Sequence, residues 1–373
     1  MTSELEFSTI PTQTGPCDGS AEHRAKRRRI LTLLDEAGLD SVALTSQAAL
    51  AWYLEGARTH VSLAAPPIVA VVVSRDRDRV HVTSNESHRL AGEELPGWAE
   101  VVEHPWHGNV GAAAEAEALS SGGAREADLE AGLRSVRQEL LPAEVARFRE
   151  LGSDVAALLT RTLETASPHQ SERSLAARLS GGIVELGAEP VVVLVGGESR
   201  RLERHPLPTG ARLGRRAMVV VCARRRGLIL NATRWIRFGP RSEEERDADL
   251  RILRVEAAFL EASRPGGSLA SAFAAGTRAY AFNGFAETEW ERHHQGGIAG
   301  YAGRDPRAAP GVDVALGSDV AFAWNPTAIG CKVEDTILRT ATGLDVLSAD
   351  PTWPSVSSDI GGILVPRPDV LEL

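Results

Sequence analysis

The chain of 373 residues has few aromatic side chains (5%), only three cysteines and no apolar run long enough to cross a membrane. A membrane-spanning helix needs about 20 predominantly apolar residues, so no span is expected. Three cysteines are an odd number and have no metal-ligand spacing, which indicates a reducing compartment without a disulfide framework. The expected location is therefore the cytoplasm.

The net charge and the composition of the N-terminus argue against two further classes of protein, those that bind nucleic acid and those that carry a signal peptide. The formal net charge is −9 at pH 7, whereas nucleic-acid binding needs a basic face, so nucleic acid is not expected as a partner. Residues 1–20 are rich in Ser, Thr, Pro and Gly and lack both a basic start and an apolar run. They predict a disordered tail and not a signal peptide. The length fits two domains.

The N-terminal half alternates helical and strand patterns, which predicts a compact α/β unit. Gly38 is a typical stop for its first helix, and the weakly patterned stretch 108–127 fits a helix plus a linker. Apolar periodicity places the other elements as follows: helices at 22–37 and 47–54, and strands at 41–45, 67–73 and 80–83.

A proline at a helix start, Pro142, opens the second unit with a long amphipathic helix. The remaining patterns place helices at 171–187, 242–263 and 268–283, and strands at 191–195, 218–221, 227–230, 233–238, 320–324 and 333–339. No internal repeat is visible.

The order of motifs resembles the creatinase / aminopeptidase P / prolidase family of "pita-bread" hydrolases. In the N-terminal half, residues 48–56 and 86–90 are similar to that family's "tyrosine-leucine-x-glycine" and "glutamate…arginine-leucine" segments. In the C-terminal half, the segment from Glu198 to Pro208 resembles the one that carries the substrate-side histidine, and Asn231-Ala-Thr-Arg234 resembles "aspartate-x-threonine-arginine". The resemblance covers about residues 22–345.

The resemblance also implies which positions correspond to the family's five metal ligands: Cys222, Asn231, Gly297, Asn325 and Glu334. The family offsets two divalent cations with four carboxylates and an imidazole, ligands that such cations prefer. Here a single carboxylate remains, and glycine offers no side chain. A two-metal site, whose ions lie about 3.5–4 Å apart, is therefore not expected, and we predict no metal and no cofactor. The alternative is a single metal held by His293 or His294.

His205 is the first candidate for catalysis. It precedes a Pro-x-Pro turn, and the corresponding histidine of the resembling family faces the substrate, including in creatinase, which is metal-free. An imidazole with a pKa near 6.5 suits general acid–base work at neutral pH. The alternative is a loop histidine satisfied by local hydrogen bonds.

Glu334 is the second candidate, because a carboxylate facing a cleft needs a cation or a hydrogen-bond donor. It is expected to bind a substrate amine or guanidinium or to orient His205, and the alternative is a structural pair with Arg234. Cys222 offers a thiol beside a histidine, which is either a nucleophile or a packed core side chain.

The remaining candidates for substrate binding are polar residues of the expected cleft: Asn231, Asn325, His293, His294, Tyr301 and Arg304, together with Cys222. Several of them belong to a glycine-spaced loop. Glycines let the backbone approach a ligand closely, but they also permit tight strand crossing.

We therefore expect an α+β fold of two domains. After the tail at 1–20, a creatinase-like N-terminal α/β domain at 21–138 precedes a pita-bread domain with a curved antiparallel sheet at 139–373. The resemblance implies a homodimer and a small-molecule substrate. The first functional hypothesis is a metal-independent enzyme that cleaves a C–N bond of a small nitrogen-containing molecule, or carries out a related elimination or rearrangement. The alternatives are a non-catalytic binding protein and, less favoured, a Xaa-Pro aminopeptidase.

Overall fold

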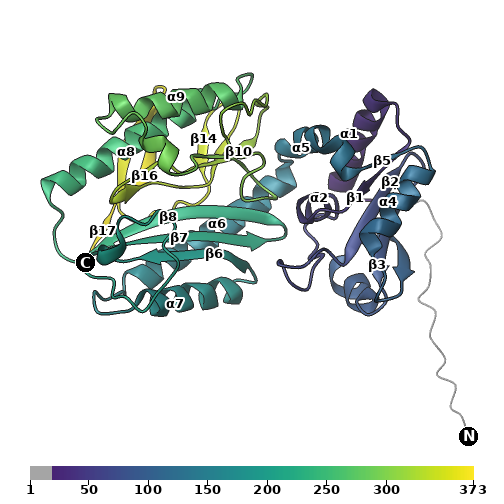
Figure 1. Cartoon of the computed structure of the whole chain (residues 1–373), viewed down its shortest axis with the longest axis horizontal. Coiled ribbons are helices and arrows are strands. Elements are labelled where there is room, and N and C mark those ends of the chain that lie inside the picture. The colour runs from purple at the N-terminus through teal and green to yellow at the C-terminus, as the bar shows by residue number, and fades with distance from the viewer. Residues whose placement is uncertain (1–18) are drawn as a thin grey trace, which may run out of the picture.

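The computed structural model describes residues 19–373, which fold into two units that lie side by side (Figure 1). The N-terminal unit contains a five-stranded mixed sheet with the strand order β4-β3-β2-β1-β5. Its strands are β1 (Ser41–Leu44), β2 (Val69–Ser74), β3 (Asp78–Thr83), β4 (Glu100–His104) and β5 (Ala124–Arg125). Strands β1 to β3 pair antiparallel, and β4 and β5 join the edges in parallel. The predicted tail lies outside the described residues, apart from its last two positions.

Helices pack against this sheet, and those at 21–37, 47–53 and 110–120 lie where the sequence predicts helices. The hydroxyl of Ser20 caps the first helix by accepting from the backbone N–H of His23, and Gly38 ends it with a φ of 66°. The weakly patterned stretch resolves into a helix and an edge strand, with alanines of the helix packed on the sheet. The helices are α1 (Ala21–Ala37), α2 (Gln47–Tyr53), α3 (Ser87–Arg89), α4 (Val110–Ser120) and α5 (Glu130–Gln138).

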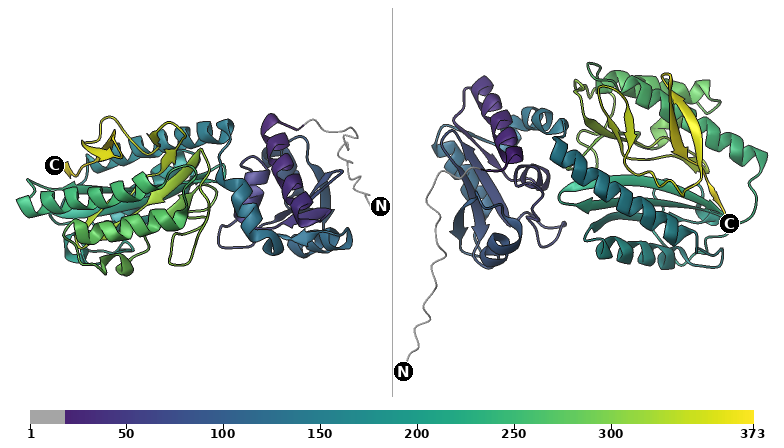
Figure 2. Two further views of the ribbon diagram at one scale, coloured as in Figure 1. Left: turned by 90° about the horizontal axis from the view of Figure 1, so that it is seen from above. Right: turned by 180° about the vertical axis from the view of Figure 1, so that it is seen from behind.

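The C-terminal unit places two four-stranded sheets between two pairs of helices (Figures 1 and 2). One sheet has the order β17-β8-β7-β6 and consists of β6 (Glu189–Gly196), β7 (Arg216–Arg225), β8 (Leu228–Arg237) and β17 (Leu371–Glu372). The other has the order β14-β13-β10-β9 and consists of β9 (Gly296–Ala299), β10 (Val320–Trp324), β13 (Ile337–Arg339) and β14 (Leu344–Val346). The helices are α6 (Pro142–Leu163), α7 (Glu172–Glu185), α8 (Glu243–Ala262) and α9 (Leu269–Phe282).

Strand β8 corrects the sequence-based assignment. Two short strands were expected at 227–230 and 233–238, but the chain forms one strand of ten residues that pairs with β7 along its whole length. Cross-strand partners point to the same face, and this face alternates along the strands. Three pairs therefore share the face toward the site: Met218 with Trp235, Val220 with Thr233, and Cys222 with Asn231.

Two hairpins were missed by the sequence-based assignment. The hairpins β11 (Thr327–Ala328) with β12 (Cys331–Lys332) and β15 (Ser355–Ile360) with β16 (Ile363–Pro368) have no clear sequence pattern. The expected strand at 333–339 becomes regular only at β13. No helix of the described residues is long and apolar enough to cross a membrane.

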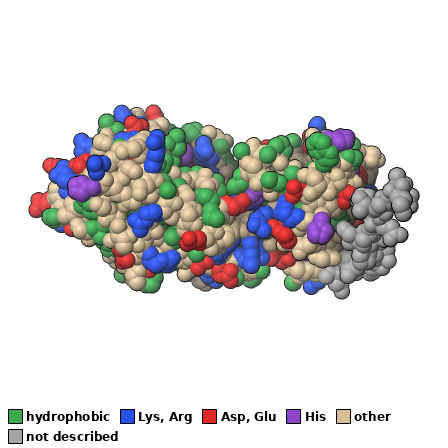
Figure 3. Space-filling view, turned by 90° about the horizontal axis from the view of Figure 1, so that it is seen from below, with side chains coloured by type: hydrophobic (Ala, Val, Ile, Leu, Met, Phe, Trp, Pro, Cys, Tyr) green, Lys and Arg blue, Asp and Glu red, His purple; other side chains and the backbone are tan. Residues whose placement is uncertain are grey.

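Buried ion pairs join the two units. The ammonium of Lys26 on α1 lies 2.6 Å from Glu22 and 2.9 Å from Glu144 on α6. Arg147 pairs with Glu22 through two nitrogens, and the hydroxyl of Tyr301 donates to Glu144 at 2.6 Å. The side chains of Lys26 and Glu144 are 0% exposed. Elsewhere on the surface, basic and acidic side chains are interspersed on the face that Figure 3 shows.

Replacing Lys26 with Met is expected to destabilise the protein by about 3–5 kcal/mol, because a buried carboxylate loses its cation. The measurement is the free energy of unfolding in urea. Arg28→Met on the same helix is the matched control, because Arg28 is exposed and such changes stay within about 0.5 kcal/mol. Equal midpoints for the two variants would contradict the role of this network.

Candidate functional site

The site is assembled by the β7–β8 pair and the segment that precedes β13. The backbone N–H of Thr233 donates to the carbonyl of Glu334 at 2.8 Å, and that of Asn231 donates to the hydroxyl of Thr336 at 2.8 Å. These bonds fix the 334–336 segment against β8. Asn325 follows β10, and its N–H donates to the carbonyl of Gln295 at 2.9 Å, beside the histidines that precede β9.

Glu334 is buried and held by three donors. Its Oε1 lies 2.6 Å from the guanidinium of Arg304, and its Oε2 lies 3.1 Å from the ammonium of Lys332 and accepts from the hydroxyl of Thr233 at 2.9 Å. Burial alone would raise the pKa of this carboxyl. The two cations outweigh burial and hold the pKa at about 2, so the group is ionised at neutral pH.

Arg234 is not the partner of Glu334, so the alternative of a Glu334–Arg234 pair is wrong. The guanidinium of Arg234 pairs with Asp335 at 2.9 Å and donates to the carbonyl of Ser348 at 2.6 Å. The adjacent acids Glu334 and Asp335 therefore have different cationic partners. Arg234 therefore stabilises the fold.

Lys332 is the residue that sequence reasoning missed. It lies on β12, two positions before Glu334, and its side chain is 2% exposed. A signal was present, because Lys26 and Lys332 are the two lysines among the 41 basic residues of the chain. In a sequence that otherwise uses arginine, each lysine lies in a buried ion network.

Three histidines from two segments come together. His205, in the loop between β6 and β7, has its Nε2 3.0 Å from the Nε2 of His293, and the rings of His293 and His294 stack at 4.3 Å between centroids. Burial, then the charge of Lys332, lowers the pKa of His205 and lowers that of His293 to about 2. Burial and nearby arginines lower that of His294 to about 3. All three rings are neutral at pH 7.

These histidines are the one group among residues 19–373 with the geometry to hold a metal ion, since one nitrogen of each lies within 4.8 Å of the others. Two observations argue against that use. A metal-binding histidine normally donates its other ring N–H to a partner, but Nδ1 of His293 and of His294 is buried without one. The cations that depress their pKa would also repel a metal ion.

The five positions of the family's two-metal centre do not fit metal ions either. Their one carboxylate, Glu334, is engaged by two cations. At Gly297 the backbone has a φ of 144°, and a Cβ would lie 2.5 Å from the carbonyl oxygen of Pro306. A histidine side chain therefore has no room at that position without a backbone shift.

The two asparagines at positions that the resemblance aligns with metal ligands are buried acceptors without a donor. Asn231 is 0% and Asn325 is 2% exposed. Among the described residues, neither Oδ1 accepts a hydrogen bond, although Nδ2 of Asn231 donates to the carbonyl of Ile229 at 3.1 Å. An unpaired buried acceptor is costly, so both oxygens are available to a ligand donor.

Two other predicted residues are placed differently from the histidines. Burial, with the negative charge of Glu334, raises the pKa of the Cys222 thiol to about 12, which favours an unreactive thiol over a nucleophile. The hydroxyl of Tyr301 donates to Glu144 in the ion network between the units. Its contacts are those of a structural residue.

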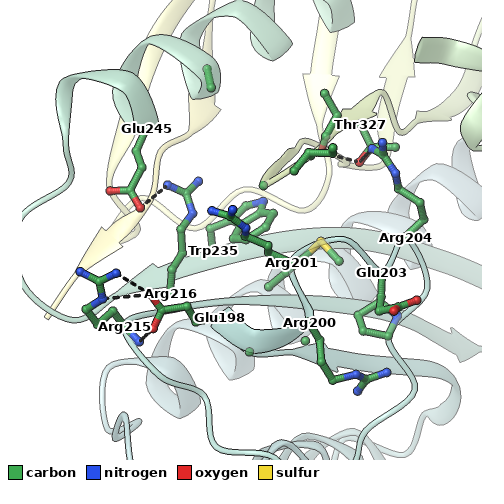
Figure 4. A pocket seen from close by; sticks show the side chains of 18 of the residues that line it. Glu198, Arg200, Arg201, Glu203, Arg204, Arg215, Arg216, Trp235, Glu245 and Thr327 are labelled. Carbon is green, nitrogen blue, oxygen red and sulfur yellow. Dashed lines mark hydrogen bonds and ion pairs between the residues drawn. The ribbon is translucent and has the colours of Figure 1, made fainter. Parts of the chain in front are cut away.

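A cavity of about 220 Å³ lies next to the loop between β6 and β7 (Figure 4). Its wall includes Arg204 and Pro206, which flank His205, and Trp235, whose indole N–H donates to the carbonyl of Lys332 at 2.9 Å. The predicted site residues themselves are not part of its lining. The cavity therefore adjoins the loop that carries His205, and neither the three histidines nor Glu334 line it.

No family model matches the chain, and no curated protein matches its sequence. Solved structures do match: dipeptidase PepE from Mycobacterium ulcerans is 19% identical with a TM-score of 0.72 over 96% of this chain and 100% of that one. The prolidase from Pyrococcus horikoshii is 17% identical (TM-score 0.70, 87% and 98%). The N-terminal domain of the FACT complex subunit SPT16 from chickpea is 12% identical (TM-score 0.63, 88% and 96%). The chain has the two-domain pita-bread fold of prolidase-like proteins, as its sequence predicts.

The neutral histidines predict loss of stability in mild acid. The unfolded chain protonates His293 and His294 below about pH 6.5, whereas the folded chain resists protonation down to about 2 and 3. The unfolded state binds more protons in this window. For each ring, the free energy of unfolding therefore decreases by up to about 1.4 kcal/mol for every unit by which the pH is lowered. Glu334, whose pKa is depressed, adds a loss in the same direction below about 4.5.

The measurement is the free energy of unfolding in denaturant between about pH 7 and pH 5. His294→Gln should reduce the slope, and His169→Gln, at an exposed histidine, should leave it unchanged. A wild-type slope no steeper than that of His294→Gln would show that these rings titrate normally.

Proposed function

We propose that the chain is a metal-independent enzyme that acts on a small, nitrogen-containing, amino-acid-like molecule and cleaves a carbon–nitrogen bond. The observation that carries the proposal is the pair of buried amide oxygens at Asn231 and Asn325 that accept no hydrogen bond from described residues. The N–H groups of a bound amine, amide or guanidine would supply the missing donors. Recognition of nitrogen thus takes the place of metal ligation.

His205 is suited to carry the proton. Its ring is neutral at pH 7, and the residue is exposed in the loop that borders the cavity. In hydrolysis it takes a proton from the attacking water as the water oxygen bonds to carbon, and it gives that proton to nitrogen as the C–N bond breaks. His293, 3.0 Å away, holds the ring through a hydrogen bond between the two Nε2 atoms.

Glu334 acts in this proposal as a positioning residue. A carboxylate with a pKa of about 2 and three bound donors is a poor proton carrier at neutral pH. Its contacts instead fix the ammonium of Lys332 and the guanidinium of Arg304 in the site. This differs from the direct substrate contact that the sequence suggests for Glu334.

A non-catalytic binding protein is the second candidate. The match to a subunit of the FACT complex favours it, because that neighbour is named as part of an assembly and not as a peptidase. The same buried acceptors would then recognise a ligand without turnover. The other matched structures are named as dipeptidase and prolidase, which makes dipeptides one arm of any substrate panel.

Replacing His205 with Ala distinguishes the two candidates. For the enzyme, kcat on the best substrate should fall by about 10²–10⁴-fold, because general acid–base catalysis is lost, while binding is retained. The measurement is turnover and equilibrium binding over a panel of N-amidino and N-alkyl amino acids and dipeptides, with His169→Ala as the control. If no compound is turned over and both variants bind alike, the enzyme proposal is wrong and the binding role stands.

Metal removal gives an independent test. The purified protein should contain no stoichiometric Mn, Co or Zn, and chelation should leave its activity and unfolding midpoint unchanged, because the donor set lacks the anionic ligands these ions need. Elemental analysis is the measurement. Tightly bound metal at one or two ions per chain would overturn metal independence.

A further inference from the structure

The candidate site contains more cationic side chains than its single carboxylate can neutralise. Lys332 and Arg304 both contact the single carboxylate of Glu334. Arg307 adds a third cation next to β9, where its backbone forms a bridge with Gly297, and its charge contributes to the lowered pKa values of His205 and His294. Within the described part of the chain, no carboxylate lies at ion-pair distance from Arg307. Three cations thus face one anion.

The surrounding titratable groups do not remove this excess. The rings of His205, His293 and His294 are neutral, so they add no charge and offer N–H donors and nitrogen acceptors. Glu334 is the carboxylate that acts on all three rings, and the charge of Lys332 opposes it on each of them. An excess of two positive charges remains around the rings.

The fold fixes the backbone of Arg307 and buries the side chain of Lys332. Arg307 forms a backbone bridge with Gly297, and the N–H of Ala308 donates to the carbonyl of Gly296 at 2.9 Å, which fixes the exposed arginine at the edge of β9. Lys332 is buried, and Glu334 is its one ion-pair partner among the described residues. An ammonium has three N–H donors, so donors remain for a ligand.

We infer that this site binds a dianionic group, a phosphoryl group or two carboxylates, between Lys332 and Arg307 and against the three histidines. That the dianion belongs to the substrate rests on the proposed function; that the site binds one does not. The substrate class becomes an acidic amino-acid-like compound, with its nitrogen on the asparagine side. The cavity bounded by Arg204 and Trp235 (Figure 4) adjoins the loop that carries His205 and does not include the dianion site.

The test measures binding by titration calorimetry with inorganic phosphate, malonate and acetate at about pH 8, where phosphate is a dianion. Wild type should bind phosphate or malonate at one site per chain and acetate at least about tenfold more weakly, since acetate lacks the second charge. A higher affinity for phosphate than for malonate indicates that the natural ligand carries a phosphoryl group. A higher affinity for malonate indicates that it carries two carboxylates.

Three variants locate the site. Arg307→Gln, at an exposed position, should weaken binding by about tenfold through loss of one charge-assisted contact. Lys332→Met should weaken it at least as much. Arg278→Gln, an exposed arginine on α9, should leave it unchanged. If Lys332→Met fails to fold, Arg307→Gln alone decides between site binding and binding elsewhere.

The failures of the two proposals are distinguishable. If Arg307→Gln weakens dianion binding but no compound is turned over, the enzyme proposal is wrong and this inference still holds. Turnover of neutral or cationic amines by a protein that binds phosphate and malonate no better than acetate overturns the inference and leaves the enzyme proposal intact. Equal weakening by Arg278→Gln also overturns it.

Discussion

The ionised state of one buried carboxylate, Glu334, organises the centre of this protein. An isolated charge away from water is costly, and the ammonium of Lys332, the guanidinium of Arg304 and the hydroxyl of Thr233 offset that cost. These contacts tie the loop after β9, the β11–β12 hairpin and the segment on β8 to a single point. The histidines, the asparagines and the cavity wall take their positions around it.

The same constraint separates this site from a metal centre on the same fold. A two-metal site collects carboxylates around cations that come from solution. Here the cations are covalent parts of the chain, the carboxylates are reduced to one, and amide oxygens occupy two of the other positions. The cations beside Glu334 are therefore supplied by the chain itself.

The sequence predicted the fold well because regular elements follow local patterns. The Ser20 cap and Gly38 stop of α1, and the proline that opens α6, are signals that adjacent residues carry. Strand β8 was split in error because polar Asn231 interrupts its apolar run, although that residue pairs with β7 like its neighbours. The domain boundaries and the homodimer implied by the resemblance remain predictions.

The site was predicted only in part, because its contacts join residues that are distant in sequence. His205 meets His293 across 88 positions, and Arg304 meets Glu334 across 30. Motif spacing identified these residues but not their partners, so the alternative pairing of Glu334 with Arg234 was wrong. Lys332 was overlooked because its neighbour Glu334 carries the recognisable motif, and its role appears only when the ammonium is seen beside that carboxylate.

The burial of both lysines has a consequence for the chemistry of the folded surface. The side chains of Lys26 and Lys332 are 0% and 2% exposed, and the chain has no third lysine. Amine-specific acylating reagents, cross-linkers and lysine-directed proteases therefore meet no freely exposed lysine on the native molecule. Any modification of Lys26 reports separation of the two units, and any modification of Lys332 reports opening of the site.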